Sequence, residues 1–182
     1  MKINQLNIEQ LIEKCILQNQ EAQLEVYNRY YKAMYNTAYR ILKNTQEAED
    51  VMQDAFLNAF TKLDTLENTS LFTAWLKRIT INLSIYALKK SQRLHKVSMD
   101  SISYSLTETE EECNNENSVM KAQEVIKNLH ELKSSYRIVL SLHFIEGYDY
   151  EEISEIMNLK PGNIRTLISR GKESLRKKLK VV

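Results

Sequence analysis

Glycine and proline are nearly absent from this sequence, whose 182 residues include three glycines and one proline. Average proteins devote roughly 12% of their residues to these two types. Tight hairpin turns and the loops that cradle phosphate groups both depend on glycine. The scarcity therefore argues against sheet architectures and nucleotide-binding loops, and it favours an all-α fold.

Cysteine, histidine and long apolar runs are also scarce. Cys15 and Cys113 lie far apart and form no Cys-x-x-Cys pattern, and His95, His130 and His143 are isolated. No apolar run is long enough for a signal peptide or a membrane span. We therefore expect a cytoplasmic protein in a reducing compartment, with no membrane insertion, no metal site and no cofactor.

Three long segments each have almost no charge of one sign. Residues 97–119 contain six acids and no lysine or arginine, whereas residues 70–96 contain six basic residues and no acid. Residues 160–182 contain eight basic residues and the single acid Glu173. The net charge of +1 hides this segregation. Basic strips of this kind are typical of surfaces that bind a polyanion.

Apolar residues recur at helical spacing on both sides of a polar segment. A short loop is expected at residues 65–70, and the polar, non-periodic segment reads as a flexible acidic linker. We predict one helical domain over residues 1–96, the linker over 97–118 and a second helical domain over 119–182. The residues expected to face the two cores include Leu24, Met34, Ala38, Ile41, Val51, Phe56, Val125, Ile126, Leu129, Ile138, Leu142 and Phe144.

The second domain ends in a predicted helix-turn-helix. Asp149 and Glu152 have the spacing of an N-terminal capping box, and Pro161 suits the first turn of the next helix. That helix buries residues such as Ile164 and Gly171. The outer face, which suits phosphates and base edges, holds Asn163, Arg165, Thr166, Ser169, Arg170, Lys172, Arg176 and Lys177.

Three segments together resemble the extracytoplasmic-function (ECF) class of bacterial RNA polymerase sigma factors. Residues 46–57 resemble the helix that binds the polymerase clamp, and residues 72–82 resemble the helix that recognises and melts the minus-ten element. Residues 146–170 resemble the helix-turn-helix that reads the minus-thirty-five element. The resemblance covers both predicted domains, in the order found in the family.

The resemblance implies roles for particular residues. Asp50, Gln53 and Asp54, which share one helix face by their spacing, match positions that bind the clamp helices of the largest polymerase subunit. The minus-ten candidates, some proposed from the acid-free basic strip, are Asn68, Thr69, Arg78, Asn82, Lys89, Lys90 and Arg93. The minus-thirty-five candidates are Asn163, Arg165, Thr166, Ser169, Arg170 and Lys172. The implied partners are polymerase core, including the flap of the second-largest subunit, promoter DNA and an anti-sigma factor.

Three positions depart from the common family pattern. Tyr86 stands where an aspartate is frequent, Leu167 where an arginine is frequent, and Lys160 where a serine-like cap is usual. Leu167 removes an expected DNA contact, so the sequence does not define the promoter preference. Trp75 is interpreted as a core residue rather than a base-stacking platform.

Other classes of function account for less of the sequence than a sigma factor does. The main alternative is a polymerase-independent helix-turn-helix regulator, in which a ligand occupies a pocket among Tyr27, Tyr30, Tyr31, Tyr35 and Tyr39. An enzyme is disfavoured because no His, Cys or Ser has a recognisable nucleophile or metal arrangement. A purely structural helical protein leaves the two basic strips unexplained.

Overall fold

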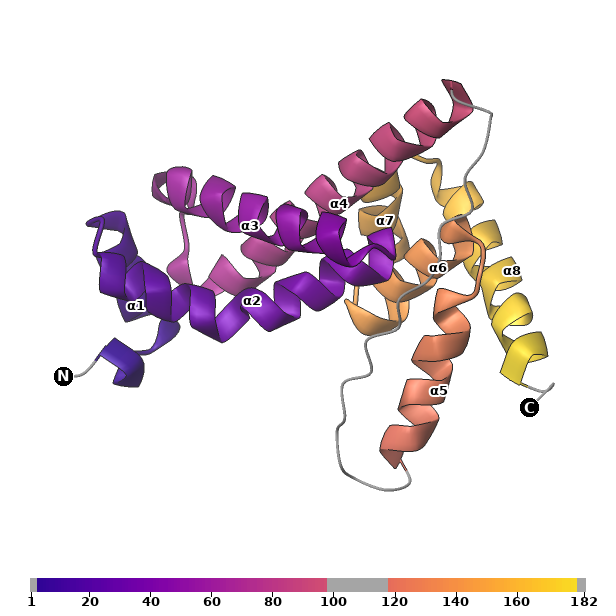
Figure 1. Cartoon of the computed structure of the whole chain (residues 1–182), viewed down its shortest axis with the longest axis horizontal. Helices are drawn as coiled ribbons and strands as arrows, with labels where there is room; N and C mark the ends of the chain where they lie inside the picture. The colour runs from indigo at the N-terminus through magenta and orange to yellow at the C-terminus, as the bar shows by residue number, and fades with distance from the viewer. Residues whose placement is uncertain (1–2, 98–117, 180–182) are drawn as a thin grey trace. The chain divides into compact units, whose positions relative to one another are not determined.

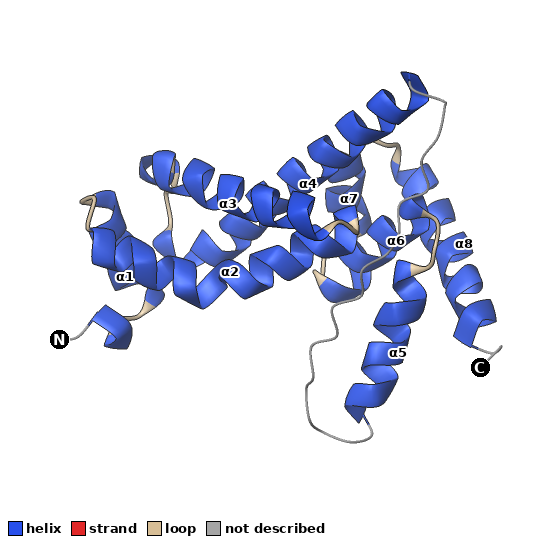
Figure 2. Cartoon of the chain, in the orientation of Figure 1, coloured by secondary structure: helices blue, strands red, loops and turns tan. Residues whose placement is uncertain are grey.

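A computed structural model describes residues 3–97 and 118–179, and all the regular structure within them is helical (Figures 1 and 2). The all-α prediction is therefore confirmed. The chain divides into two compact units, Met1–Lys90 and Ser91–Val182. The predicted acidic linker lies outside the described residues at positions 98–117, so its flexibility and the exact domain limits stay predictions.

Residues 3–97, which include the described part of the first unit and the end of its last helix beyond Lys90, form four α-helices and three short 3₁₀ segments. Asparagine side chains cap the first three α-helices: Asn7, Asn19 and Asn44 each accept a hydrogen bond from a backbone amide of the first turn. These caps explain where the helices begin without help from glycine or proline. The elements are η1 (Ile3–Gln5), α1 (Ile8–Ile16), α2 (Gln20–Leu42), α3 (Thr45–Thr61), η2 (Leu63–Thr65), η3 (Thr69–Leu71) and α4 (Phe72–Val97).

The core of the first unit is continuous from α1 to the start of α4. Buried side chains include Leu11, Met34, Phe56 and Phe72. The tyrosines of α2 pack against this core; the ring centroids of Tyr27 and Phe56, for example, lie 4.9 Å apart. The tyrosine stripe is therefore part of the packing of the unit.

Cys15 of α1 lies in this core and is 1% exposed. Burial raises the pKa of its thiol to about 11, compared with roughly 8.5 in an unfolded chain. A raised pKa contributes stability that is complete below about pH 8.5 and lost as the pH rises toward 11, because only the unfolded chain ionises in that window.

We predict that the free energy of unfolding of the wild type falls more steeply between pH 8 and pH 10 than that of Cys15→Ala. The expected difference is about 2 kcal/mol, from the two pKa values. Urea unfolding of both proteins at the two pH values measures it. Parallel pH dependences of the two proteins would show that the native thiol ionises as readily as the unfolded one.

The second unit contains α5 (Ser118–His130), α6 (Ser134–Leu140), a π-helical segment η4 (Ser141–Ile145), α7 (Tyr150–Met157) and α8 (Pro161–Leu179). Gly147 ends the π-helical segment with a φ of 82°, a conformation that glycine adopts without strain. The predicted capping box is present, since Asp149 and Glu152 each accept a hydrogen bond of 2.8 Å from the other's backbone amide. The α7–α8 pair confirms the predicted helix-turn-helix.

Gly171 sets the distance between α8 and α6. A Cβ atom at this position would lie 3.2 Å from two carbon atoms of Leu140 and 3.3 Å from the Cβ of Tyr136. Such contacts are closer than ordinary van der Waals packing, so a side chain here requires its neighbours to move. Ile164 and Ile168, on the same face of α8, are fully buried.

Four of the residues expected in the cores are exposed instead. Leu24 is 60% exposed and Phe144 59%, and Val125 and Ile126 of α5 are close to 40%. Helical spacing identifies residues that share a face, but it does not say how much of that face a small unit covers. Among the α5 residues whose side chains are described, 122–130, the buried ones lie near the C-terminal end, where Leu129 is found.

Candidate nucleic-acid interface

The α3 helix presents an exposed polar face opposite its buried face. Val51, Ala55 and Phe56 are buried, whereas Asp50, Gln53 and Asp54 are all exposed. Neither carboxylate forms a salt bridge within the described residues. The structure thus brings the three predicted polymerase-binding residues together on one face, and their charges are available to a partner.

The minus-ten candidates are spread over the loop before α4 and along α4 itself. Asn68 caps η3, and its Oδ1 accepts hydrogen bonds from the backbone amide and the hydroxyl of Ser70 at 3.0 and 2.7 Å. The loop expected at residues 65–70 is therefore partly ordered as 3₁₀ turns. Only the Oδ1 atom of Asn68 takes part in these two bonds, and its NH₂ group is not used in either of them.

Along α4, the candidates differ in how far they are exposed. Asn82, Lys89, Lys90 and Arg93 are exposed, whereas Arg78 is half-buried. Arg78 and Lys89 each take part in an interaction within the chain, which differs from the expectation that the cations of this strip have few intramolecular partners. Trp75 is half-buried against the core, 6.2 Å from the ring of Phe72, in agreement with its interpretation as a packing residue.

The outer face of α8 contains five of the six minus-thirty-five candidates in exposed positions. These residues are Asn163, Arg165, Thr166, Ser169 and Arg170. Thr166 also donates its hydroxyl proton to the carbonyl oxygen of Gly162 at 3.0 Å, so in this arrangement its hydroxyl offers a partner only its two acceptor lone pairs. Two arginines, an amide and two hydroxyls on one face are suited to hydrogen bonds with base edges and phosphates.

Lys172 differs from the other five. It is half-buried, and its Nζ lies 5.6 Å from the ring centroid of Phe144, in a cation–π contact. Phe144, which the sequence placed in the core, therefore supports a cation at the edge of the α8 face. Sequence reasoning missed this pair because the two residues lie on different elements.

The acid in the basic C-terminal strip has a local partner. The Glu173 carboxylate forms an ion pair with Lys177, with an Nζ–Oε1 distance of 2.9 Å. This pair holds the pKa of the Glu173 carboxyl below its usual range. The pair offsets one positive charge near the end of α8. The charges of Arg165 and Arg170, which are exposed nearer the start of the helix, are not offset by this pair.

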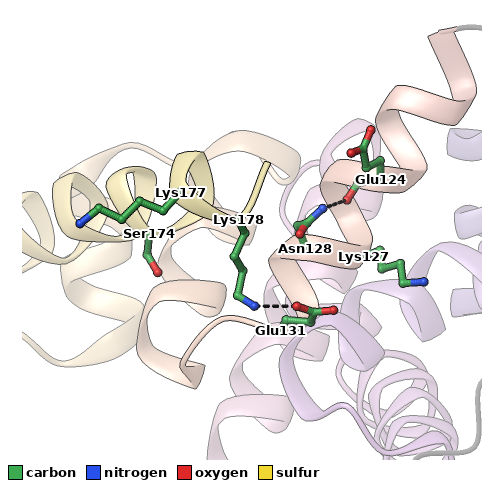
Figure 3. Close-up of a pocket in the computed structure, with 7 residues that line it drawn as sticks. All are labelled: Glu124, Lys127, Asn128, Glu131, Ser174, Lys177 and Lys178. Atoms are coloured by element: carbon green, nitrogen blue, oxygen red, sulfur yellow. Dashed lines mark hydrogen bonds and ion pairs between the residues drawn. The ribbon is translucent and has the colours of Figure 1, made fainter. Parts of the chain in front are cut away.

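A groove between α5 and α8 was not predicted from the sequence (Figure 3). Lys178 crosses it to Glu131 with an N–O distance of 2.6 Å, and the Asn128 amide donates to the backbone oxygen of Glu124. Its lining mixes carboxylates and ammonium groups, so it does not form a surface of one charge. In the part of the chain that is described, no group of His, Cys, Asp or Glu side chains is arranged to hold a metal ion. None of the helices described there has the apolar stretch that a membrane span requires.

Both units match known families. Residues 26–94 match sigma-70 region 2, and residues 122–175 match sigma-70 region 4. The helical fold and these two matches define a factor of the sigma-70 type.

Similar proteins narrow the class. The chain is 30% identical over 189 residues to the ECF RNA polymerase sigma factor SigW of Bacillus subtilis (strain 168), covering 95% of this chain and 99% of that protein. It is 27% identical over 183 residues to the ECF RNA polymerase sigma-E factor of Escherichia coli (strain K12), covering 96% and 95%. The chain belongs to the ECF sigma factors. Its function is that of a sigma factor, which directs RNA polymerase to promoters to initiate transcription.

Solved structures agree with this assignment. The sigma factor RpoE from Bartonella quintana, in complex with the anti-sigma factor NepR, superposes with a TM-score of 0.64 and 25% identity, covering 86% of this chain and 96% of that chain. CnrH, in complex with the cytosolic domain of CnrY, has the same fold, with a TM-score of 0.57, 22% identity and coverage of 96% and 97%.

Proposed function

We propose that the two units divide the work of a promoter-specific sigma factor, without catalysis of their own. Residues 1–96 bind polymerase core through Asp50, Gln53 and Asp54 and open the minus-ten region. Residues 119–182 read the minus-thirty-five element through α8, and residues 97–118 connect them. The observation that carries this division is the opposite character of the exposed faces of α3 and α8, acidic on one and basic on the other.

Polymerase core and promoter DNA follow from these two faces. The two exposed carboxylates on α3, which form no salt bridge within residues 3–97 and 118–179, suit a basic helical surface such as the clamp helices of the largest polymerase subunit. Arginines, an amide and hydroxyls on α8 suit the major groove. The minus-ten surface comprises Asn68, Thr69, Asn82 and the cations of α4, which contact the DNA backbone and a nearby base.

An anti-sigma factor is a further proposed partner. The similar sigma factor RpoE of Bartonella quintana was solved in complex with an anti-sigma factor, NepR. A protein that covers the exposed faces of this chain would keep it from polymerase.

The proposed place of action is the cytoplasm, because both polymerase and DNA are found there.

The proposal predicts that the purified chain binds promoter DNA weakly and that polymerase core makes binding tight. Each unit alone offers only a handful of phosphate contacts, and few contacts give weak binding at physiological salt. Core holds both units at the spacing of the two promoter elements, which makes the second contact intramolecular and raises its effective concentration. We expect core to increase the affinity for promoter DNA by about 10²-fold or more. Once the complex has formed, permanganate reactivity should appear at the minus-ten region.

The measurement is a DNA-binding titration of the chain with and without core, followed by permanganate footprinting. A promoter with a scrambled minus-thirty-five element serves as the control. Tight, sequence-specific binding by the chain alone, with no affinity for core, would instead identify an independent helix-turn-helix regulator.

A further inference from the structure

Leu57 is a large apolar side chain on the solvent side of α3. It is 65% exposed, whereas its neighbours Ala55, Phe56 and Ala59 are buried. With 100° between successive residues, Leu57 points almost directly away from the middle of that buried stripe. Packing within its own unit therefore does not account for a leucine at this position.

The residues that share the face of Leu57 are the proposed polymerase contacts. Asp50, Gln53 and Asp54 precede it by seven, four and three residues, which puts all four side chains on one stripe of the helix. All four are exposed. An apolar side chain bordered by charged and amide groups is the arrangement found in protein interfaces, where an apolar centre is surrounded by a polar rim.

We propose that Leu57 is the apolar anchor of the polymerase-binding face and inserts into an apolar recess on a basic helical surface of polymerase core. This inference rests on the proposed function, in that α3 is taken as the face that meets polymerase. The acidic residues favour a basic partner and speed the encounter. Removal of Leu57 from water adds a contact that salt does not screen and that slows dissociation.

The test compares three single variants for binding to polymerase core. Leu57→Ala should raise the dissociation constant at least about tenfold, as expected for a buried anchor at an interface. Leu57→Met keeps the apolar volume and should stay within about threefold of the wild type. Leu17→Ala, at an 80% exposed leucine that ends α1, is the matched control and should bind like the wild type.

Two further readouts separate the anchor from other effects. Thermal unfolding should be similar for all three variants and the wild type, because the replaced side chains are on the surface. Raising the salt concentration should weaken the binding of both the wild type and Leu57→Ala to core. The ratio of their dissociation constants should stay the same, because salt does not screen apolar contacts.

The outcomes distinguish this proposal from the function on which it rests. If Leu57→Ala binds core like the wild type while Asp50→Lys with Asp54→Lys does not bind, the anchor is refuted and the α3 interface stands. If neither protein is impaired, both fail. If Leu57→Ala weakens binding to an anti-sigma factor and not to core, the proposed occupant of this face is wrong.

Discussion

Replacing Asp50 and Asp54 together by lysine is expected to abolish co-purification of the chain with RNA polymerase core. Both carboxylates are exposed and lack a salt bridge in the described part of the chain. The change turns attraction toward a basic helix into repulsion at two adjacent positions, and like charges across an interface cost several kcal/mol. We expect a loss of affinity of about 10³-fold, which corresponds to roughly 4 kcal/mol.

The variant should remain folded, because surface positions away from the core change stability little. Circular dichroism and thermal unfolding check this directly. Glu9→Lys with Glu13→Lys is the matched control: these two acids are also exposed and also four residues apart, but they lie on α1. Equal losses in both double variants would point to a general effect of charge and would remove the α3 assignment.

The second large effect is expected on α8. Arg165→Ala and Arg170→Ala remove the two arginines of the exposed face, and an arginine that makes paired hydrogen bonds to a guanine contributes about 1–3 kcal/mol of base discrimination. Each change should weaken promoter binding by the holoenzyme and relax the preference at one position of the minus-thirty-five element. The Lys172→Ala effect should be smaller, because the lysine is half-buried over Phe144.

Selection of promoters from a randomised minus-thirty-five element measures the preference of each variant. Arg176→Ala, an exposed arginine near the end of α8, is the control for a general loss of positive charge. It should lower binding to all sequences alike. A selected consensus that is unchanged when Arg165, Arg170 and Lys172 are all replaced would refute the assignment of this face.

The sequence predicted the helical class and the helix-turn-helix because both depend on local rules. Periodicity, the Asp149 and Glu152 capping box and the lone Pro161 act within a few residues, and the structure contains each of them. The asparagine caps at Asn7, Asn19 and Asn44 follow the same local rule and were a signal in the sequence that the prediction did not use.

The failures share a different cause, which is that they depend on distant elements. Exposure of Leu24, Val125 and Ile126 depends on where neighbouring helices lie, and periodicity does not contain that information. The contact between Lys172 and Phe144 joins residues on separate elements. Leu57 was not among the residues expected in the core, and its exposure is informative only once the buried face of α3 is known.

The close approach at Gly171 also limits how descendants of this chain can diverge. Because α8 contacts Leu140 and Tyr136 without a side chain between them, a mutation that tilts or slides the helix disturbs the whole unit. A duplicated copy that acquires new target genes must therefore keep the contacts of α8 with α6 and change the outer surface of α8. Under the proposed role of α8, promoter choice evolves at exposed positions such as Arg165, Ser169 and Arg170, where substitution costs the fold little.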